Sequence, residues 1–178
     1  FPVNKVMQTT LVREIFNKRL IVKKDDPALW NRYFEKTDFN NIYKFGITRH
    51  PVSKFESAFN YLNSINKYSQ QLIENQEINV FVKNKMSNCS NPFEINPHFE
   101  RQNESFYCRD TLLVNDLYQI ESKENISRLY EKLNIKAEKK KIRRNKTQHH
   151  ELLNSESIKI LESIYKNDIH PLKYESMI

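Results

Sequence analysis

The chain has 178 residues, a net charge of +7, 38% hydrophobic and 12% aromatic residues, and a single glycine. This length and hydrophobic content predict one folded domain, residues 1–178, and exclude a disordered chain. One glycine excludes the phosphate loops G-x-x-x-x-G-K-[ST] and G-x-G-x-x-G, while the positive charge favours an anionic partner such as a nucleotide, nucleic acid, acidic glycan or membrane surface.

The first part of the chain is predicted to alternate strands with helices. A strand is expected at Phe1–Val3, and a helix over Thr9–Arg19, where apolar residues recur at helical spacing. A short apolar run predicts a second strand at Leu20–Val22. Asp25-Asp26-Pro27 then suits the cap and first position of a helix over Ala28–Lys36.

The clearest strand of the sequence is Ile42–Thr48, which is rich in β-branched and aromatic residues. Arg49 follows it, and Pro51 ends the strand and opens a helix. The apolar residues of that helix fall on one face: Phe55, Ala58, Phe59 and Leu62. A further helix is expected over Ser69–Asn84.

The second half of the chain continues the same alternation. Asn88–Asn103 is predicted to be a loop, Thr111–Ile120 a strand and Lys123–Leu133 an amphipathic helix. The basic run Lys136–Lys146 follows, and then a helix over Ser155–Tyr165. Strands that alternate with helices predict an α/β domain with a mainly parallel sheet flanked by helices.

Two strand ends are candidate anion sites, because open parallel sheets bind ligands beyond the carboxyl ends of their strands. The first is the turn Asn4–Thr10, where a lysine and hydroxyls precede a helix start. The second joins Arg49 at the end of a strand to Ser57 on the next helix. A plain turn, an arginine that caps a sheet edge and a serine on a helix face are the structural alternatives.

The second candidate site carries a recognisable pattern. Arg49, Pro51, Lys54, Ser57 and Phe59 fill the spacing R-x-P-x-x-[RK]-x-x-S-x-[YF]. This pattern resembles the 3′-phosphate motif of sulfotransferases that use 3′-phosphoadenosine 5′-phosphosulfate (PAPS). The most similar branch is that of carbohydrate sulfotransferases, which includes the Golgi chondroitin and HNK-1 enzymes and bacterial relatives.

The first candidate site is similar to the other half of that family's nucleotide site. The branch has a 5′-phosphosulfate loop resembling V-P-K-V-A-C-T-x-W, and the residues from Val3 to Leu11 fall in register with it. Lys5 and Thr9 keep the lysine and threonine. Asn4 and Leu11 replace the proline and the tryptophan.

Weaker similarities extend the resemblance along the chain. His98–Gln102 resembles H-W-x-P-Q, and Leu113–Glu121 resembles a later family strand. Arg144–Thr147 and Tyr165–Asp168 resemble R-x-N-x-S and Y-x-x-D near the end of the family domain. The resemblance implies a P-loop-NTPase-like sulfotransferase fold.

The resemblance also implies an activity and a site. A sulfuryl group would move from PAPS to an acceptor hydroxyl, and no metal is expected. Lys5 would stabilise the departing oxygen as a catalytic residue, and Arg49 and Ser57 would hold the 3′-phosphate. The remaining expected nucleotide contacts are Val6, Gln8, Thr9, Thr10, Arg143 and Arg144.

The general base, the acceptor and the compartment stay open. His98 is the candidate base, with Asp25 and Asp26 as alternatives. We expect a carbohydrate or small-molecule acceptor and no nucleic acid, and membrane association would need a segment absent from this chain. Cys89 and Cys108 leave both a bridge and free thiols open, so bacterial cytoplasm and Golgi lumen both remain.

Two other classes of function fit parts of the sequence. Another P-loop-like nucleotide enzyme, such as a small kinase, would need a magnesium-binding acid at a strand end. A basic module for nucleic acid or acidic glycan would use the Lys136–Lys146 run and bind with steep salt dependence. Nucleotide preference separates the three hypotheses.

Overall fold

The computed structural model describes residues 43–64, 77–108, 111–134 and 152–178. The chain divides into two compact units. We call Phe1–Ile47 with Phe106–Ile142 the strand unit, and Thr48–Ser105 with Arg143–Ile178 the helical unit. The elements expected within residues 1–41 lie outside the described residues, and the prediction of a single domain stays a prediction.

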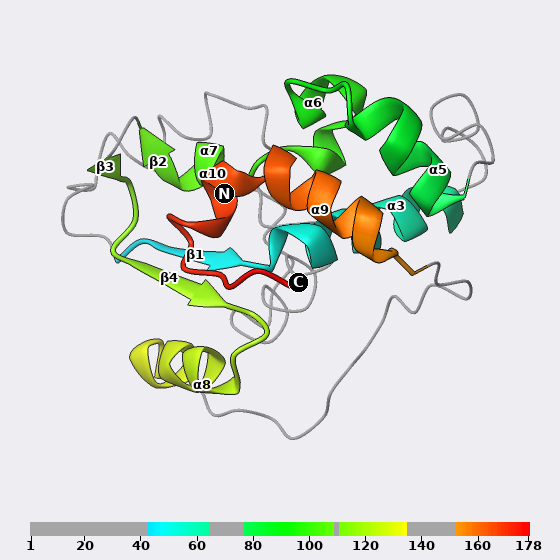
Figure 1. Cartoon of the computed structure of the whole chain (residues 1–178). Helices are drawn as coiled ribbons and strands as arrows, with labels where there is room; N and C mark the ends of the chain where they lie inside the picture. Colours follow the sequence, from blue (N-terminus) through cyan, green and yellow to red (C-terminus); the bar gives the residue numbers. More distant parts are fainter. Residues whose placement is uncertain (1–42, 65–76, 109–110, 135–151) are drawn as a thin grey trace. The chain divides into compact units, whose positions relative to one another are not determined.

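The strand unit contains a small parallel sheet. Strand β1 (Phe45–Thr48) lies beside β4 (Asp116–Gln119), and both arrows run in the same direction in Figure 1. Helix α8 (Lys123–Lys132) follows, with the Ser122 side chain accepting a hydrogen bond from the Asn125 N–H as its cap. The predicted strand at Ile42–Thr48 is therefore confirmed in its second half, and the predicted helix at Lys123–Leu133 is confirmed.

The core of this small sheet is built by alternate residues of the strands and one face of the helix. Ile47 and Tyr118 come from β1 and β4, and Leu129 of α8 is completely buried in the same cluster. Gly46 is also buried, against the side chains of Phe106 and Leu117. The sheet and α8 give the mixed α/β class that the alternation predicted.

The predicted single strand Thr111–Ile120 is wrong, because the structure divides it. Thr111–Leu112 (β3) pairs antiparallel with Tyr107–Cys108 (β2), and β4 begins only at Asp116. At the break, the Asn115 side chain accepts a hydrogen bond from the Lys44 N–H at 2.8 Å, and the Asn115 N–H donates to the Lys44 carbonyl at 2.8 Å. A bend at Val114 and Asn115 separates β3 from β4.

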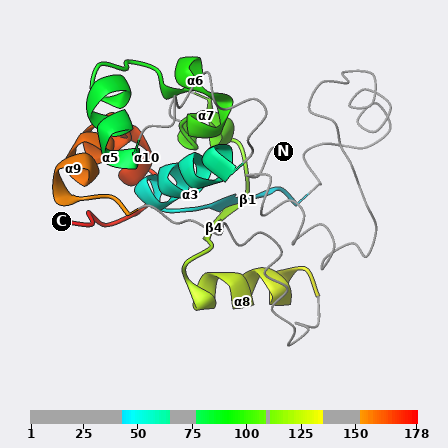
Figure 2. The same ribbon diagram turned by 90° about the vertical axis from the view of Figure 1, so that its right-hand side faces the viewer.

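The helical unit is built around α3 (Pro51–Ser64) and α9 (Ser155–Ile164), which pack against each other (Figures 1 and 2). Both helices confirm their predictions. The shorter elements of the unit are α5 (Ile78–Phe81), the π-helix η2 (Val82–Met86), α6 (Pro92–Ile95), the 3-10 turn η3 (Pro97–Phe99), α7 (Asn103–Phe106, whose last residue belongs to the strand unit) and α10 (Lys166–Ile169).

The structure differs in detail from two elements predicted in the middle of the chain. The helix expected over Ser69–Asn84 continues to Met86, where the Ser87 N–H bonds to the Val82 carbonyl in a π-helical turn. Its predicted start lies outside the described residues. The loop expected over Asn88–Asn103 contains the turns α6 and η3, each opened by a proline and capped by an asparagine side chain.

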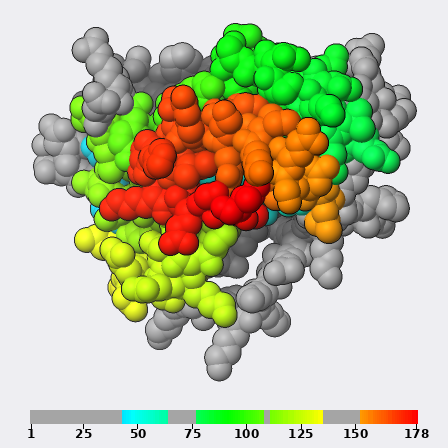
Figure 3. Space-filling model, in the orientation of Figure 1, coloured from blue at the N-terminus to red at the C-terminus, as the bar shows by residue number. Residues whose placement is uncertain are grey.

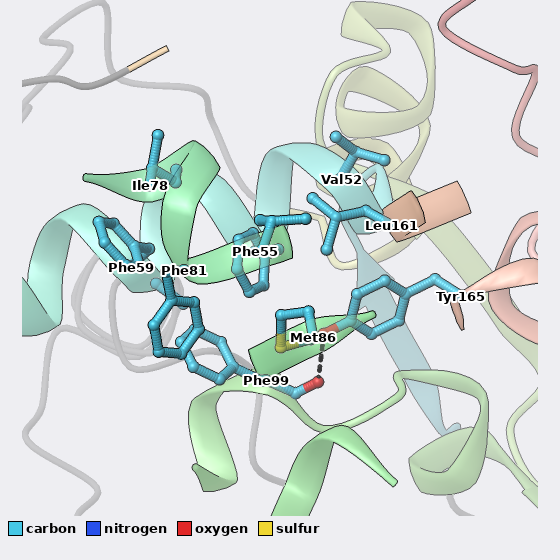
Figure 4. Close-up of a cluster of buried hydrophobic side chains, with 11 residues drawn as sticks. Val52, Phe55, Phe59, Ile78, Phe81, Met86, Phe99, Leu161 and Tyr165 are labelled. Atoms are coloured by element: carbon cyan, nitrogen blue, oxygen red, sulfur yellow. Dashed lines mark hydrogen bonds between the residues drawn. The ribbon is translucent and has the colours of Figure 1, made fainter. Parts of the chain in front are cut away.

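Closely packed aromatic residues form the core of the helical unit (Figure 4). The rings of Phe55 and Phe99 lie 4.8 Å apart between centroids, and those of Phe59 and Phe81 5.3 Å apart. The other buried members are Val52, Ala58, Ile78, Val82, Met86, Leu161 and Tyr165. Full burial of such a side chain contributes about 1.5–3 kcal/mol, so this cluster fixes the position of α3 within its unit.

Residues 152–178 form one continuous surface in Figure 3, from α9 in orange to the C-terminal segment in red. The C-terminal segment is held by side chains at the start of the helical unit. The Thr48 and Tyr174 hydroxyls lie 2.9 Å apart, and His50 Nε2 is 3.0 Å from the Glu175 carbonyl oxygen. The tail therefore contacts both residues that flank Arg49.

Candidate functional site

Arg49 lies between β1 and α3, at the carboxyl end of the strand as the sequence predicted. The Lys54 N–H bonds to the His50 carbonyl at 2.8 Å, so the helix starts immediately after His50. Its first turn contains no acidic residue. A helix N-terminus carries partial positive charge and unpaired N–H groups, so this start and Arg49 together favour an anion.

The motif residues differ in their exposure to solvent. Ser57 and Arg49 are both half-buried and retain access to solvent. Phe59 is fully buried in the aromatic cluster, and Lys54 is only 6% exposed. Pro51 is buried as well, so packing accounts for three positions of the pattern and leaves Arg49 and Ser57 as its accessible polar members.

Lys54 binds within the helical unit. Its ammonium group donates a hydrogen bond to the backbone carbonyl of Glu100. Burial lowers the pKa of Lys54 to about 8, although the negative charges of Asp168, Glu100 and Glu104 oppose that shift. A buried lysine with a protein partner supports the fold rather than the binding of an exposed phosphate.

Gln102 holds the backbone of Arg49. Its Oε1 accepts from the Arg49 N–H at 2.9 Å, and its Nε2 donates to the Arg49 carbonyl at 2.7 Å. The side-chain amide thus satisfies both main-chain groups of one residue, as a neighbouring strand would. Gln102 is only 8% exposed, so little water competes for these bonds.

Asp168 of α10 in turn holds Gln102. Its Oδ2 accepts from the Gln102 N–H at 2.8 Å and its Oδ1 from the Asn103 N–H at 2.9 Å, and the residue is fully buried. Burial raises the pKa of Asp168, while these two N–H groups and Lys54 act in the opposite direction.

The segment that contains Gln102, residues 96–103, is held at further points, and we call it the Gln102 loop. The Tyr165 hydroxyl donates to the Phe99 carbonyl at 2.6 Å, which Figure 4 shows as a dashed line. Arg101 donates to the carbonyls of Ile164 at 3.3 Å and Ser90 at 2.8 Å. These bonds connect the loop to the end of α9 and to the segment that contains Ser90.

His98 lies on the Gln102 loop with one ring nitrogen fixed. Asn96 Oδ1 accepts the His98 backbone N–H at 2.9 Å, and His98 Nδ1 lies 2.9 Å from the same oxygen. Because that oxygen is an acceptor, Nδ1 carries the proton and Nε2 is the basic nitrogen of the neutral ring. The Tyr61 ring lies 5.7 Å from the His98 ring, between centroids. This tautomer suits a general base.

The structure brings together Arg49 and the loop that carries His98, through Gln102. It describes nothing of the other expected site residues, because they lie outside the described ranges: Lys5, Val6, Gln8, Thr9, Thr10, Asp25, Asp26, Arg143 and Arg144.

Sequence reasoning gave no role to Gln102 or Asp168, although both fall in segments with a family resemblance. The local sequence gave no signal that either residue is buried, because Arg101 and Asn103 flank Gln102 and Lys166 and Asn167 precede Asp168. A small kinase would need a magnesium-binding acid at a strand end, and Asp116 is the aspartate within the expected strand Thr111–Ile120. Asp116 begins β4 and accepts from the Tyr43 hydroxyl at 2.6 Å, so it lies at the amino end of its strand.

Three further observations concern residues 43–64, 77–108, 111–134 and 152–178. Cys89 is a free cysteine. No helix in these ranges is long and apolar enough to cross a membrane, and no group of three or more His, Cys, Asp or Glu residues there could hold a metal ion. No protein-family model, curated protein or solved structure matches the chain.

Proposed function

We propose that this chain is a PAPS-dependent sulfotransferase with a P-loop-NTPase-like fold, and that its acceptor is a hydroxyl group on a carbohydrate. The proposal starts from the spacing of Arg49, Pro51, Lys54, Ser57 and Phe59. It is supported by the position of Arg49, which follows a strand of a parallel sheet and precedes a helix without an acidic first turn. Ligands of parallel α/β proteins bind at such strand ends.

The observation that carries the proposal is the pairing of Gln102 with Arg49. It joins two segments that separately resemble the family and lie 53 positions apart in the chain. Holding both backbone groups of Arg49 reduces the freedom of its main chain. Because the backbone that carries the guanidinium is already fixed, less conformational entropy is lost when the group binds a phosphate.

The chemistry proposed for this arrangement is an in-line transfer that depends on positioning and charge stabilisation. Arg49 and Ser57 would bind the 3′-phosphate, with charge-assisted hydrogen bonds from the guanidinium. Lys5 would stabilise the departing oxygen, and Thr9 and Thr10 would hold the 5′ end of the nucleotide. His98 Nε2 would accept the proton of the attacking hydroxyl, consistent with Nδ1 acting as the donor to Asn96.

Nucleotide competition tests this proposal against the other enzyme class. Adenosine 3′,5′-bisphosphate (PAP), the desulfated product, should raise the melting temperature of the protein without magnesium. ATP should not displace PAP at equal concentration. Stabilisation by magnesium-ATP alone would instead support a kinase, and salt-sensitive binding of oligonucleotides without nucleotide preference would support a basic binding module.

A transfer assay identifies the acceptor class. Radiolabelled PAPS is incubated with the protein and with sulfate-free oligosaccharides, and label in the sugar fraction is measured. Transfer to a sugar hydroxyl supports the proposal. Binding of PAP together with transfer only to small phenols or amines would retain the sulfotransferase and refute the carbohydrate acceptor.

A further inference from the structure

We propose that Asp168 is a positioning residue, whose buried carboxylate sets the place of Arg49 through the Gln102 loop. The inference deepens the proposed function, and it rests on that function for the role of Arg49 in phosphate binding. Its geometric part depends only on the contacts of the helical unit. The carboxylate touches neither Arg49 nor any proposed ligand contact directly.

The connection from Asp168 to Arg49 has two hydrogen-bonded steps. Asp168 Oδ2 accepts from the Gln102 N–H at 2.8 Å, and the side chain of the same Gln102 bonds to both main-chain groups of Arg49. Asp168 is 0% and Gln102 8% exposed. Because water has little access to either residue, a displaced Gln102 cannot replace its partners from solvent.

The negative charge of Asp168 matters because two donors converge on it. An ionised carboxylate only accepts, so it satisfies the Gln102 and Asn103 N–H groups together. A protonated carboxyl, or an asparagine in its place, presents one donor of its own toward these N–H groups. Either change removes one acceptor and therefore shifts the start of α7 relative to α10.

Charged and titratable groups surround Asp168 from several elements. Lys54 on α3 favours the carboxylate, while Glu104 on α7 disfavours it. Tyr165, at the end of α9, also experiences the negative charge of Asp168. Lys54 additionally donates to the Glu100 carbonyl, so the positive partner of Asp168 is anchored to the same Gln102 loop. Protonation of Asp168 should therefore move the loop as a unit.

The unmodified protein provides the first test, by amide NMR shifts across a pH titration. The Gln102 and Asn103 amides should titrate with one midpoint above the ordinary range of an aspartate, because burial raises the pKa of Asp168. The Arg49 amide should shift with the same midpoint. The Ser157 amide, which is capped by Asn154 in α9, should not follow it. An Arg49 amide that does not share the midpoint would overturn the proposal.

The second test measures the hydrogen-exchange rate of the Arg49 amide in variants of the protein. Asp168→Asn should speed that exchange by about tenfold or more, because the Gln102 Oε1 that protects it is displaced. Asn154→Ala is the matched control: it removes the cap of α9, which lowers stability without a contact to the Gln102 loop. Equal effects of both variants would reduce Asp168 to a general stabilising role and refute the inference.

PAP affinity separates this inference from the proposed function. If PAP does not bind the unmodified protein while the Arg49 amide responds to Asp168, the function is wrong and the positioning role stands. If PAP binds and Asp168→Asn alters neither its affinity nor the Arg49 amide, the positioning role is wrong and the function stands. If the Asp168→Asn variant does not fold, the NMR titration of the unmodified protein tests the positioning role alone. The role is then refuted if the Arg49 amide does not share the midpoint of the Gln102 and Asn103 amides.

Discussion

Replacing the only glycine of the chain tests how tightly β1 is packed. A Cβ atom added to Gly46 would lie 2.5 Å from Cε1 and 2.8 Å from Cδ1 of Phe106, and 2.7 Å from Cδ2 of Leu117. Carbon atoms in contact normally stay about 3.5–4.0 Å apart. Gly46→Ala therefore forces the Phe106 ring and the end of Leu117 to move, and Phe106 is only 4% exposed.

The expected loss of stability follows from two opposing terms. Overpacking of a core costs about 1–3 kcal/mol. The loss of glycine freedom in the unfolded chain restores about 0.4–1 kcal/mol. The net prediction for Gly46→Ala is a decrease of about 1–2 kcal/mol in the free energy of unfolding, and each kcal/mol lowers the melting temperature of a chain of this size by about 2–4 °C.

Urea denaturation followed by circular dichroism measures this change, with Phe106→Leu as the partner variant. A leucine side chain lacks Cε1, the ring atom nearest to the added methyl group, so the double variant Gly46→Ala/Phe106→Leu should lose less stability than the sum of the two single changes. Gly46→Ala with unchanged or increased stability would refute the packing described for β1. Strict additivity would exclude Phe106 as the obstructing group.

Three further predictions concern the Gln102 loop and the proposed site. Tyr165→Phe should lower the free energy of unfolding by about 1–2 kcal/mol, because it leaves the buried Phe99 carbonyl without its hydrogen bond; unchanged urea denaturation would contradict this. His98→Asn should lower the transfer rate by about 10²–10⁴-fold with PAP affinity retained, and an unchanged rate would place the base elsewhere. Ser57→Ala should weaken PAP binding by about three- to tenfold in calorimetry, whereas unchanged affinity would remove Ser57 from the 3′ site.

The regular elements of the fold could be predicted where their hydrophobic pattern was long. Helix α3 has its apolar residues on one face from Phe55 onward, and α8 and α9 repeat that pattern. Strand β1 was recognisable from β-branched and aromatic residues. Such local patterns determine which face is buried, so the element and its core residues follow from the sequence.

The division of the predicted strand Thr111–Ile120 depended on a partner distant in sequence. Asn115 lies in the bend before β4, and its side chain accepts a hydrogen bond from Lys44, 71 positions away. The apolar residues of the predicted strand gave no indication of this contact. Strand ends decided by such long-range side-chain bonds cannot be located from local pattern alone.

The sequence predicted only part of the candidate site, because several of its contacts join residues that are distant in the chain. The place of Arg49 at a strand end follows from the order of strand, proline and helix. The burial of Lys54 and the bonds of Gln102 and Asp168 do not, because they join segments 46–66 positions apart. Residue identity at a motif position shows that a contact is chemically possible, and only the packing decides which partner it has.

The central claim is that Arg49 binds the 3′-phosphate, and calorimetry with a pair of nucleotides tests it most directly. PAP and adenosine 5′-phosphate differ only in that phosphate. A hydrogen bond to a charged group contributes about 1.5–3 kcal/mol, so Arg49→Ala should weaken PAP binding about 10- to 150-fold and leave the binding of adenosine 5′-phosphate nearly unchanged. Arg128→Ala, at an exposed position of α8, is the matched control and should alter neither affinity. Equal PAP affinity in Arg49→Ala and the unmodified protein would contradict the claim.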